Sequence, residues 1–117
     1  IQGKLDIQQE WFDFVIDAME EVNKSGTASR VFGNARYPVA GKTGTAQVFT
    51  IKQDEEYDAE KVAERLRDHG LFVGWAPAEN PAIVIAVVVE NGGGGSSAGA
   101  PLARQLFDTY LLDQDDG

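Results

Sequence analysis

The sequence predicts an α+β fold in which an antiparallel sheet of about three strands is covered by helices. Apolar residues recur every three or four positions near both ends of the chain, as they do along one face of a helix. Two runs rich in β-branched and aromatic residues, 71–76 and 82–90, are separated by only five residues, a spacing typical of an antiparallel hairpin. The segment 39–51, in which two glycines interrupt strand-forming residues, is expected to form the third strand.

The composition fits one domain and excludes several classes of function. The 117 residues, 43% of them hydrophobic, suffice for one core and are too few for two. The net charge is −9, so nucleic acid is not an expected partner, because phosphate binding needs clustered Lys and Arg. No cysteine is present, which excludes thiol catalysis, and the single histidine, His69, has no spaced ligand pair for a metal. We expect no metal and no cofactor.

The first helix is expected at 5–23. Asp6 is the expected N-cap because Gln9 follows three residues later, as in a capping box. An apolar face predicts that this helix packs on the core; it carries Ile7, Trp11, Phe14, Val15, Ala18, Met19 and Val22. Gly26 suits the end of the helix, and a short second turn is expected at 30–32 with Ser25 or Thr27 as its cap.

The middle of the chain predicts one helix between strands. Residues 52–58 are polar and are expected to form an exposed connection, followed by a helix at 59–68 that Asp58 caps. The run at 82–90 is apolar on both faces, which predicts a central strand with helices above and below it. His69 is expected to make a structural hydrogen bond, Trp75 to lie in the core, and Glu90 with Asn91 to secure the following turn.

The C-terminal part predicts a long connection and a final helix. Residues 92–97 are rich in glycine and are read as a flexible connection, not a phosphate loop, because no Lys-Ser/Thr pair follows. The last helix is expected at 100–112, since Pro101 is tolerated in a first turn. Its expected inward-facing residues are Leu102, Leu106, Phe107, Tyr110 and Leu111.

The segment 40–50 carries the candidate binding residues. Alternate side chains of a strand share a face, so Lys42 and Gly44 are expected on one side and Thr43 and Thr45 on the other. A cation and two hydroxyls around a glycine suit a ligand with a carboxylate. Gln47 is a further candidate because it lies two residues beyond Thr45. The Lys-Thr-Gly triplet occurs in β-lactamases and penicillin-binding proteins, but alone it also fits a polar turn that leads into a strand.

The surrounding segments make the resemblance more specific. The motif strand, a hairpin that ends in Val-Val-Val-Glu-Asn-Gly-Gly, a glycine-rich loop and a last helix together resemble the C-terminal part of the transpeptidase domain of class B penicillin-binding proteins, of the elongation-specific type. The likeness extends over about residues 11–112 and includes Gly26-Thr27-Ala28, the segment 63–69, Ala76-Pro77 and Asn80-Pro81. On this resemblance, residues 1–117 are a C-terminal portion of that domain, with an acidic, helix-containing insertion at 52–69 and a disordered tail at 113–117.

The resemblance implies a peptidoglycan D,D-transpeptidase that cross-links stem peptides through a serine acyl-enzyme. Lys42, Thr43 and Thr45 would hold the terminal carboxylate of the substrate, and the backbone N–H of Thr45 would be an oxyanion donor. Gly44 would leave room for the substrate, and Gln47 would lie beside it. The implied partners are the stem peptide, β-lactam antibiotics, the remainder of the domain and the cell-elongation glycosyltransferase complex. The implied location is the periplasmic side of the bacterial inner membrane, with the anchor in a segment outside this chain.

One part of the family pattern is missing from these residues. The family uses a serine three residues before a lysine and a Ser-x-Asn element, and none of the four serines, Ser25, Ser29, Ser96 and Ser97, fits either pattern. We therefore expect the isolated chain to be inactive, because an acyl-enzyme needs an activated serine. The alternatives are a non-catalytic peptide-binding module and a fragment of a β-lactamase or penicillin-sensor relative. An unpaired sheet edge would also predict self-association of the isolated chain.

Overall fold

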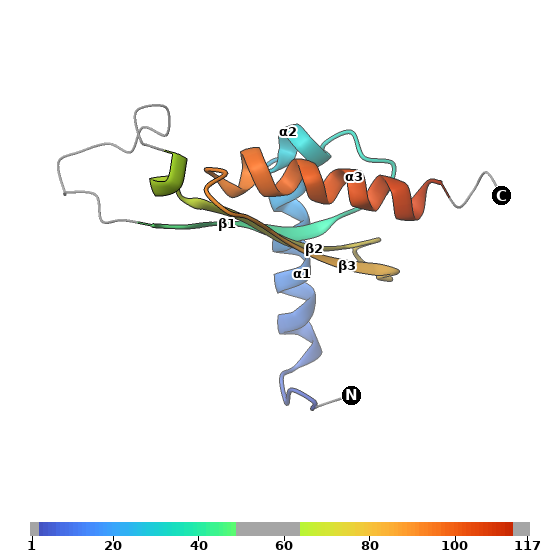
Figure 1. Cartoon of the computed structure of the whole chain (residues 1–117). Coiled ribbons are helices and arrows are strands. Elements are labelled where there is room, and N and C mark those ends of the chain that lie inside the picture. The colour runs from blue at the N-terminus through green and yellow to red at the C-terminus, as the bar shows by residue number, and fades with distance from the viewer. Residues whose placement is uncertain (1–2, 49–63, 114–117) are drawn as a thin grey trace.

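The computed structural model describes residues 3–48 and 64–113, so the predictions at 49–63 and 114–117 lie outside the described residues. Of the helix predicted at 59–68, the described part is wrong: Glu64–Leu66 form a 3₁₀ turn, and residues 67 and 68 are not helical. The elements confirm the α+β class and the antiparallel sheet of three strands (Figure 1). In chain order they are α1 (Gln9–Lys24), α2 (Ser29–Phe32), β1 (Ala40–Ala46), a 3₁₀ turn (Glu64–Leu66), β2 (His69–Ala76), β3 (Ile83–Val89), a π-helical turn (Gly95–Gly99) and α3 (Ala100–Leu111).

The sheet has the strand order β1-β2-β3, with both neighbouring pairs antiparallel. The β2–β3 hairpin therefore confirms the pairing expected from the short connection at 77–81. The central strand is β2, however, and β3 is an edge strand of the described sheet, so the prediction that β3 is covered on both sides is wrong for these residues. Helix α3 packs on one face of the sheet, while Val84 is 67% and Val88 is 63% exposed on the other.

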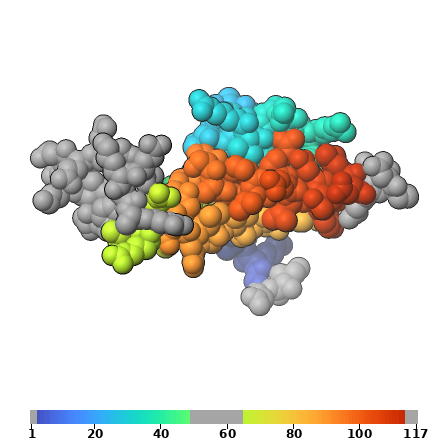
Figure 2. Space-filling model, turned by 45° about the horizontal axis from the view of Figure 1, so that its top comes forward, coloured from blue at the N-terminus to red at the C-terminus, as the bar shows by residue number. Residues whose placement is uncertain are grey.

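The core lies between the sheet and the layer formed by α2 and α3, which cover the same face (Figure 1). Figure 2 shows the atoms of α2 and α3 next to one another in this layer. The rings of Phe32 from α2 and Phe72 from β2 stack with centroids 5.3 Å apart, and Phe107 from α3 meets Phe32 edge-on at 6.2 Å. Alanines at positions 28, 76, 100 and 103 are fully buried around these rings and let the helices approach the sheet closely. The core is therefore centred on three aromatic side chains from three elements.

Helix α1 begins later than expected and only its second half is packed. Gln8 is the N-cap residue, without a side-chain capping hydrogen bond, so the predicted cap at Asp6 is wrong. Trp11, Phe14 and Val15 are exposed, because the first half of the helix extends away from the sheet on the side opposite α3 (Figure 1). At the other end, the buried Asn23 donates from Nδ2 to the carbonyl oxygen of Val39 at 2.8 Å and ties α1 to the start of β1.

The two remaining helices also depart from the sequence-based expectation at their surfaces. Ala28, with no side-chain cap, precedes α2, so neither Ser25 nor Thr27 has the predicted role. Helix α3 begins at the predicted residue, with a proline in its first turn, and Phe107 is fully buried. Leu102, Leu106 and Tyr110 are exposed, so the prediction that they lie in the core is wrong.

The glycine-rich connection is packed against the sheet. Gly93 and Gly95 are buried, and a Cβ atom built on Gly95 would lie 2.2 Å from the carbonyl oxygen of Leu71 and 2.4 Å from that of Gly44. A side chain at position 95 would therefore collide with the backbone of β1 and β2. The expectation of a flexible connection is wrong here, since the glycines permit a close contact between backbones.

Candidate carboxylate-binding strand

The register of β1 and β2 places the motif residues on two faces of the sheet. Lys42 pairs with Val73 and Gly44 with Leu71, while Thr43 pairs with Phe72 and Thr45 with Gly70. Directly opposite residues of an antiparallel pair point to the same face. Because Phe72 is buried beneath α3, Thr43 and Thr45 lie on the α3 side, and Lys42 and Gly44 lie on the opposite side. The alternation predicted from the sequence is confirmed.

The motif lies on an edge strand and is accessible. Lys42 and Thr45 are exposed and Thr43 is half-buried. The Lys42 ammonium group donates to the carbonyl oxygen of Thr43 at 2.7 Å. Gln47 is exposed but lies one residue beyond the end of β1, so strand alternation does not place it with Thr45. The outer edge of β1 pairs with no strand among the described residues, which leaves its outward-pointing backbone groups available to a ligand.

A shallow hollow of about 300 Å³ adjoins Lys42 and crosses all three strands. Its lining is apolar apart from two motif residues and consists of Lys42, Thr43, Gly44, Leu71, Phe72, Val73, Ala86, Val87 and Val88. The lysine therefore places a positive charge at the rim of an apolar surface. This combination suits a ligand that joins a carboxylate to apolar groups.

A polar cluster holds the segment that leads into β1. The hydroxyl of Tyr37 donates to Oδ1 of Asp108 on α3 at 2.5 Å, and Nε of Arg104 contacts both oxygens of Asp108 at 2.9 Å. Arg104 also donates from Nη1 to the carbonyl oxygen of Val31 at 2.7 Å and to Oδ1 of Asn34 at 3.0 Å. Sequence reasoning missed this cluster. The only sign of it in the sequence is the four-residue spacing of Arg104 and Asp108, which suits an ion pair along a helix. This spacing does not reveal their partners in distant segments.

The Tyr37 hydroxyl contributes stability that is lost at alkaline pH. Burial and the hydrogen bond to Asp108 raise the pKa of Tyr37 above its ordinary value of about 10. The folded state then binds the phenolic proton more tightly than the unfolded state, so this stabilisation is complete below about pH 10 and is lost as the pH rises through the raised pKa. We expect Tyr37→Phe to lower the free energy of unfolding by about 1–3 kcal/mol at pH 8.

Denaturant unfolding at a series of pH values from about 8 to 11 checks this expectation. The difference between wild type and Tyr37→Phe should narrow above about pH 10, because only the wild type loses the contribution of residue 37. Parallel stability curves over this range would contradict the assigned role of the Tyr37 hydroxyl.

The polar residues after the 3₁₀ turn have structural partners. The backbone N–H of Asn91 donates to Nδ1 of His69 at 2.8 Å, and Nδ2 of Asn91 donates to the carbonyl oxygens of Arg65 and Arg67. Asn91 has a φ of 52°, a conformation that asparagine tolerates better than most residues. The structural interpretation of His69 and Asn91 is confirmed. Trp75 is half-buried and donates from Nε1 to the carbonyl oxygen of Ala78 at 3.0 Å.

Comparison with known proteins identifies the family. The profile described as the penicillin binding protein transpeptidase domain matches residues 1–108. The peptidoglycan D,D-transpeptidase MrdA of Acinetobacter baumannii is 52% identical over 96 residues, which are 82% of this chain and 14% of that protein. MrdA of Escherichia coli K12 is 42% identical over 113 residues, which are 95% of this chain and 18% of that protein. The chain thus spans less than a fifth of the length of these relatives.

Solved structures agree with the sequence relatives. The crystal structure of Pseudomonas aeruginosa PBP2 in complex with WCK 5153 superposes with a TM-score of 0.76 at 39% identity, covering 96% of this chain and 22% of that one. The complex of PBP2 and MreC from Helicobacter pylori gives a TM-score of 0.71 at 28% identity, covering 95% of this chain and 19% of that one. Within the described residues, no helix combines the length and apolar character needed to cross a membrane. The chain belongs to the penicillin-binding protein transpeptidase family, and its relatives are of the PBP2/MrdA type.

Proposed function

We propose that the chain forms the carboxylate-binding side of the active site in a peptidoglycan D,D-transpeptidase. The observation that carries the proposal is the position of the Lys-Thr-Gly-Thr motif on the edge strand β1, with Lys42 exposed at the rim of an apolar hollow. The relatives named peptidoglycan D,D-transpeptidase support the reaction class. The ligand in this proposal is the stem peptide of peptidoglycan, and β-lactam antibiotics would occupy the same site.

A peptide bound along β1 could contact side chains from both faces of the strand. Lys42 would attract the terminal carboxylate from one face, and the hydroxyls of Thr43 and Thr45 would donate hydrogen bonds from the other. Gly44 has no side chain, so the peptide can come close to the backbone of β1. Peptides that add to a sheet edge bind through hydrogen bonds to such a backbone. In the proposed reaction the backbone N–H of Thr45 stabilises the developing oxyanion, a contribution of about 3 kcal/mol for one such donor. Gln47 remains a candidate for contact with the substrate beyond the end of β1.

The nucleophile in this proposal comes from outside these 117 residues. Its serine oxygen would attack a stem-peptide carbonyl carbon, forming an acyl-enzyme and releasing the leaving amine, and a second stem peptide's amine would then take the acyl group. Residues 1–117 contain no serine three positions before a lysine. The remainder of the transpeptidase domain is therefore a required partner. The family resemblance also supports a periplasmic location at the inner membrane and a place in the cell-elongation complex. The solved complex of H. pylori PBP2 with MreC is an example of a related protein bound to a protein partner.

Covalent labelling with a fluorescent penicillin tests the proposal. We expect no stable adduct on the 117-residue chain and an adduct on the longer polypeptide encoded by the same reading frame. Lys42→Ala should slow acylation of the longer polypeptide by on the order of 10²-fold. The reason is that, in this proposal, the Lys42 ammonium group attracts the carboxylate of the ligand and so holds the ligand in place for the reaction. Arg30→Ala is the matched control, since it removes an exposed positive charge from α2, away from β1. Stable labelling of the 117-residue chain, or equal effects of the two substitutions, would refute the proposal.

A non-catalytic peptide-binding module is the second candidate. The free edge of β1 favours it, because strand addition needs no nucleophile. A fragment of a β-lactamase or penicillin-sensor relative is a further alternative within the same fold. The sequence upstream of residue 1 separates these candidates: a Ser-x-x-Lys element supports the transpeptidase, and a natural start close to residue 1 supports the binding module.

A further inference from the structure

A polar pocket of about 340 Å³, here called the α2 pocket, lies between the segment around α2 and the π-helical turn. Its lining joins two segments that are distant in the sequence and consists of Thr27, Arg30, Val31, Ser96 and Ser97. No motif residue of β1 belongs to this lining, so the pocket is separate from the proposed carboxylate-binding strand. The lining holds one cation, three hydroxyls and no acidic residue, a composition that suits an anionic ligand.

Arg30 supplies an available positive charge at this pocket. Its side chain is exposed, and its guanidinium group has no ion-pair or hydrogen-bond partner among the residues that the structure describes. Lys24, by contrast, is paired with Glu20 at 2.7 Å. Residues 22–48 contain four basic residues and no Asp or Glu, although the whole chain has a net charge of −9. An anion that approaches α2 therefore meets a local excess of positive charge.

Two hydroxyls of the α2 pocket are free to donate hydrogen bonds to a ligand. The hydroxyl of Ser97 already donates to the carbonyl oxygen of Gly94 at 3.0 Å. The hydroxyls of Thr27 and Ser96 have no hydrogen-bond partner within the described part of the chain. Thr27 lies three residues before Arg30, a spacing that brings side chains to the same side of a helical turn. The donors thus come from both walls of the pocket.

Both walls are held in place by contacts elsewhere in the fold. On the α2 side, the carbonyl oxygen of Val31 accepts a hydrogen bond from Nη1 of Arg104 at 2.7 Å, and Phe32 stacks on Phe72 in the core. On the other side, Ser96 follows Gly95, which is packed against the backbone of β1 and β2. A ligand does not have to order either wall, which lowers the cost of binding.

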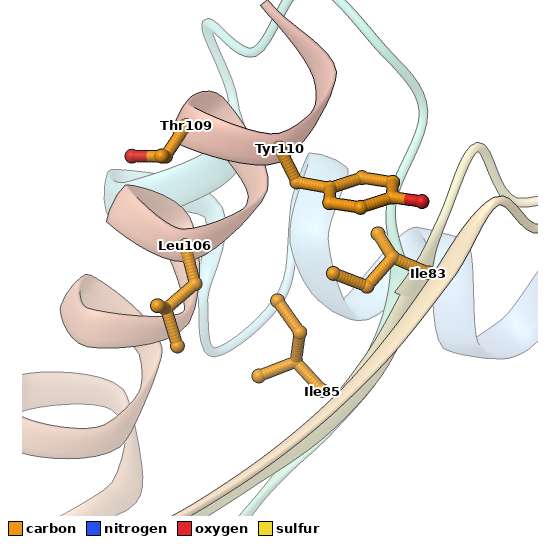
Figure 3. Close-up of a pocket in the computed structure, with 5 residues that line it drawn as sticks. All are labelled: Ile83, Ile85, Leu106, Thr109 and Tyr110. Carbon is orange, nitrogen blue, oxygen red and sulfur yellow. The ribbon is translucent and has the colours of Figure 1, made fainter. Parts of the chain in front are cut away.

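The two other cavities described suit a different chemistry. The pocket of about 440 Å³ between β3 and α3 is lined mainly by apolar side chains and carries no charged residue (Figure 3). The hollow beside Lys42 has one cation, but most of its lining is apolar. Of these three cavities, the α2 pocket is the one that combines an unpaired cation with free hydroxyls.

We propose that the α2 pocket binds a phosphate group. The planar guanidinium group of Arg30 donates two parallel hydrogen bonds to two phosphate oxygens, and the hydroxyls of Thr27 and Ser96 donate to the others. A phosphate suits these donors better than a carboxylate does, because its oxygens point in tetrahedral directions and reach both walls. The pocket is larger than a phosphate group, which leaves room for the organic part of a small phosphate monoester.

Protection of Arg30 from phenylglyoxal tests the proposal, because this reagent modifies arginine and a bound phosphate shields the guanidinium group. The full polypeptide of the reading frame is modified at constant ionic strength, and peptide mass spectrometry gives the rate at each arginine. Arg36 is the matched control in the same sample, since it is exposed in the same basic segment but does not line the pocket. With a Kd on the order of 1–10 mM, about 50 mM phosphate should slow modification at least about 5-fold at Arg30 and less than about 2-fold at Arg36.

Three variants locate the phosphate. Thr27→Val removes a donor with little change in volume, so the phosphate concentration for half protection of Arg30 should rise by about 5-fold. Thr109→Val, which removes an exposed hydroxyl from α3 outside the α2 pocket, should leave it unchanged. Lys42→Ala should also leave it unchanged, because Lys42 does not line the pocket. Glycerol 3-phosphate in place of inorganic phosphate distinguishes a monoester from the free ion, and protection by either supports the proposal.

Four outcomes would overturn the proposal. Equal protection of Arg30 and Arg36 would show a general effect of charge, and an unchanged half-protection concentration in Thr27→Val would exclude the pocket. Equal protection by acetate would assign the pocket to carboxylates. Loss of protection in Lys42→Ala would place the anion at the motif strand. Penicillin acylation is not a readout of this test, so a failed phosphate site leaves the proposed function standing, and a failed acylation leaves the phosphate site standing.

Discussion

Replacement of Gly95 by alanine is expected to destabilise the chain by about 3 kcal/mol or more, because the new methyl group has no space. Its Cβ atom would lie 2.2 Å from the carbonyl oxygen of Leu71 and 2.4 Å from that of Gly44. Both are backbone atoms of the sheet, which cannot move aside as a flexible side chain can. Chemical denaturation followed by circular dichroism measures the loss. In the longer polypeptide, the same substitution should also slow penicillin acylation, since Gly44 belongs to the proposed carboxylate-binding strand.

Gly94→Ala is the matched control for Gly95→Ala. A Cβ atom at Gly94 would meet nothing closer than Oγ of Ser97 at 3.5 Å, and the φ of −74° at this residue is open to alanine. We expect the free energy of unfolding to change by less than about 1 kcal/mol. The change can be a stabilisation, because alanine lowers the conformational entropy of the unfolded chain. Similar losses for the two variants would show that the close approach of residue 95 to β1 and β2 does not govern stability.

Phe107→Ala is expected to destabilise the chain by about 3–5 kcal/mol, the usual cost of removing a buried aromatic side chain. Phe107 is 0% exposed and its ring contacts those of Phe32 and Tyr37 with centroid distances of 6.2 and 6.3 Å. Its removal would leave a cavity where α2, α3 and the sheet meet. Equilibrium unfolding in urea, with the midpoint and slope fitted separately, checks the loss.

Leu106→Ala provides the comparison on the same helix. Leu106 precedes Phe107 but is half exposed, so its truncation in the 117-residue chain should cost less than about 1 kcal/mol. A large loss for Leu106→Ala in the isolated chain would contradict the position of this side chain at the surface.

Local patterns predicted most of the elements, and the misses have specific causes. The hairpin of β2 and β3, the final helix and the alternation around Lys42 followed from periodicity and turn length, which depend on nearby residues. The misses at Val84, Leu106 and Phe14 share one origin. An apolar residue indicates that a surface will be covered, but the pattern does not say by what, and the described residues contain no layer over these positions.

In the candidate site, too, features set by nearby residues were predicted and features set by distant contacts were not. The motif and its strand were predicted, but the cluster of Tyr37, Arg104 and Asp108 was not, because its members lie far apart in the sequence and meet only after α3 packs beside the segment that leads into β1. The buried glycine connection was read as flexible for a related reason. Composition alone does not distinguish a glycine that allows motion from one that allows two backbones to touch, and Gly95 is of the second kind.

By itself, the sequence determined that this chain is an α+β unit with an antiparallel sheet, that its motif strand presents Lys42 and the two threonines on opposite faces, and that no serine in it fits the nucleophile pattern. These properties depend on residue identity and short-range spacing. Only the tertiary structure decided that, among the described residues, β1 and β3 are the two edges of the sheet, that α2 and α3 cover one face, and that apolar side chains on the other face stay exposed. Those properties depend on contacts between distant segments, because burial is set by what packs against a residue and not by the residue alone.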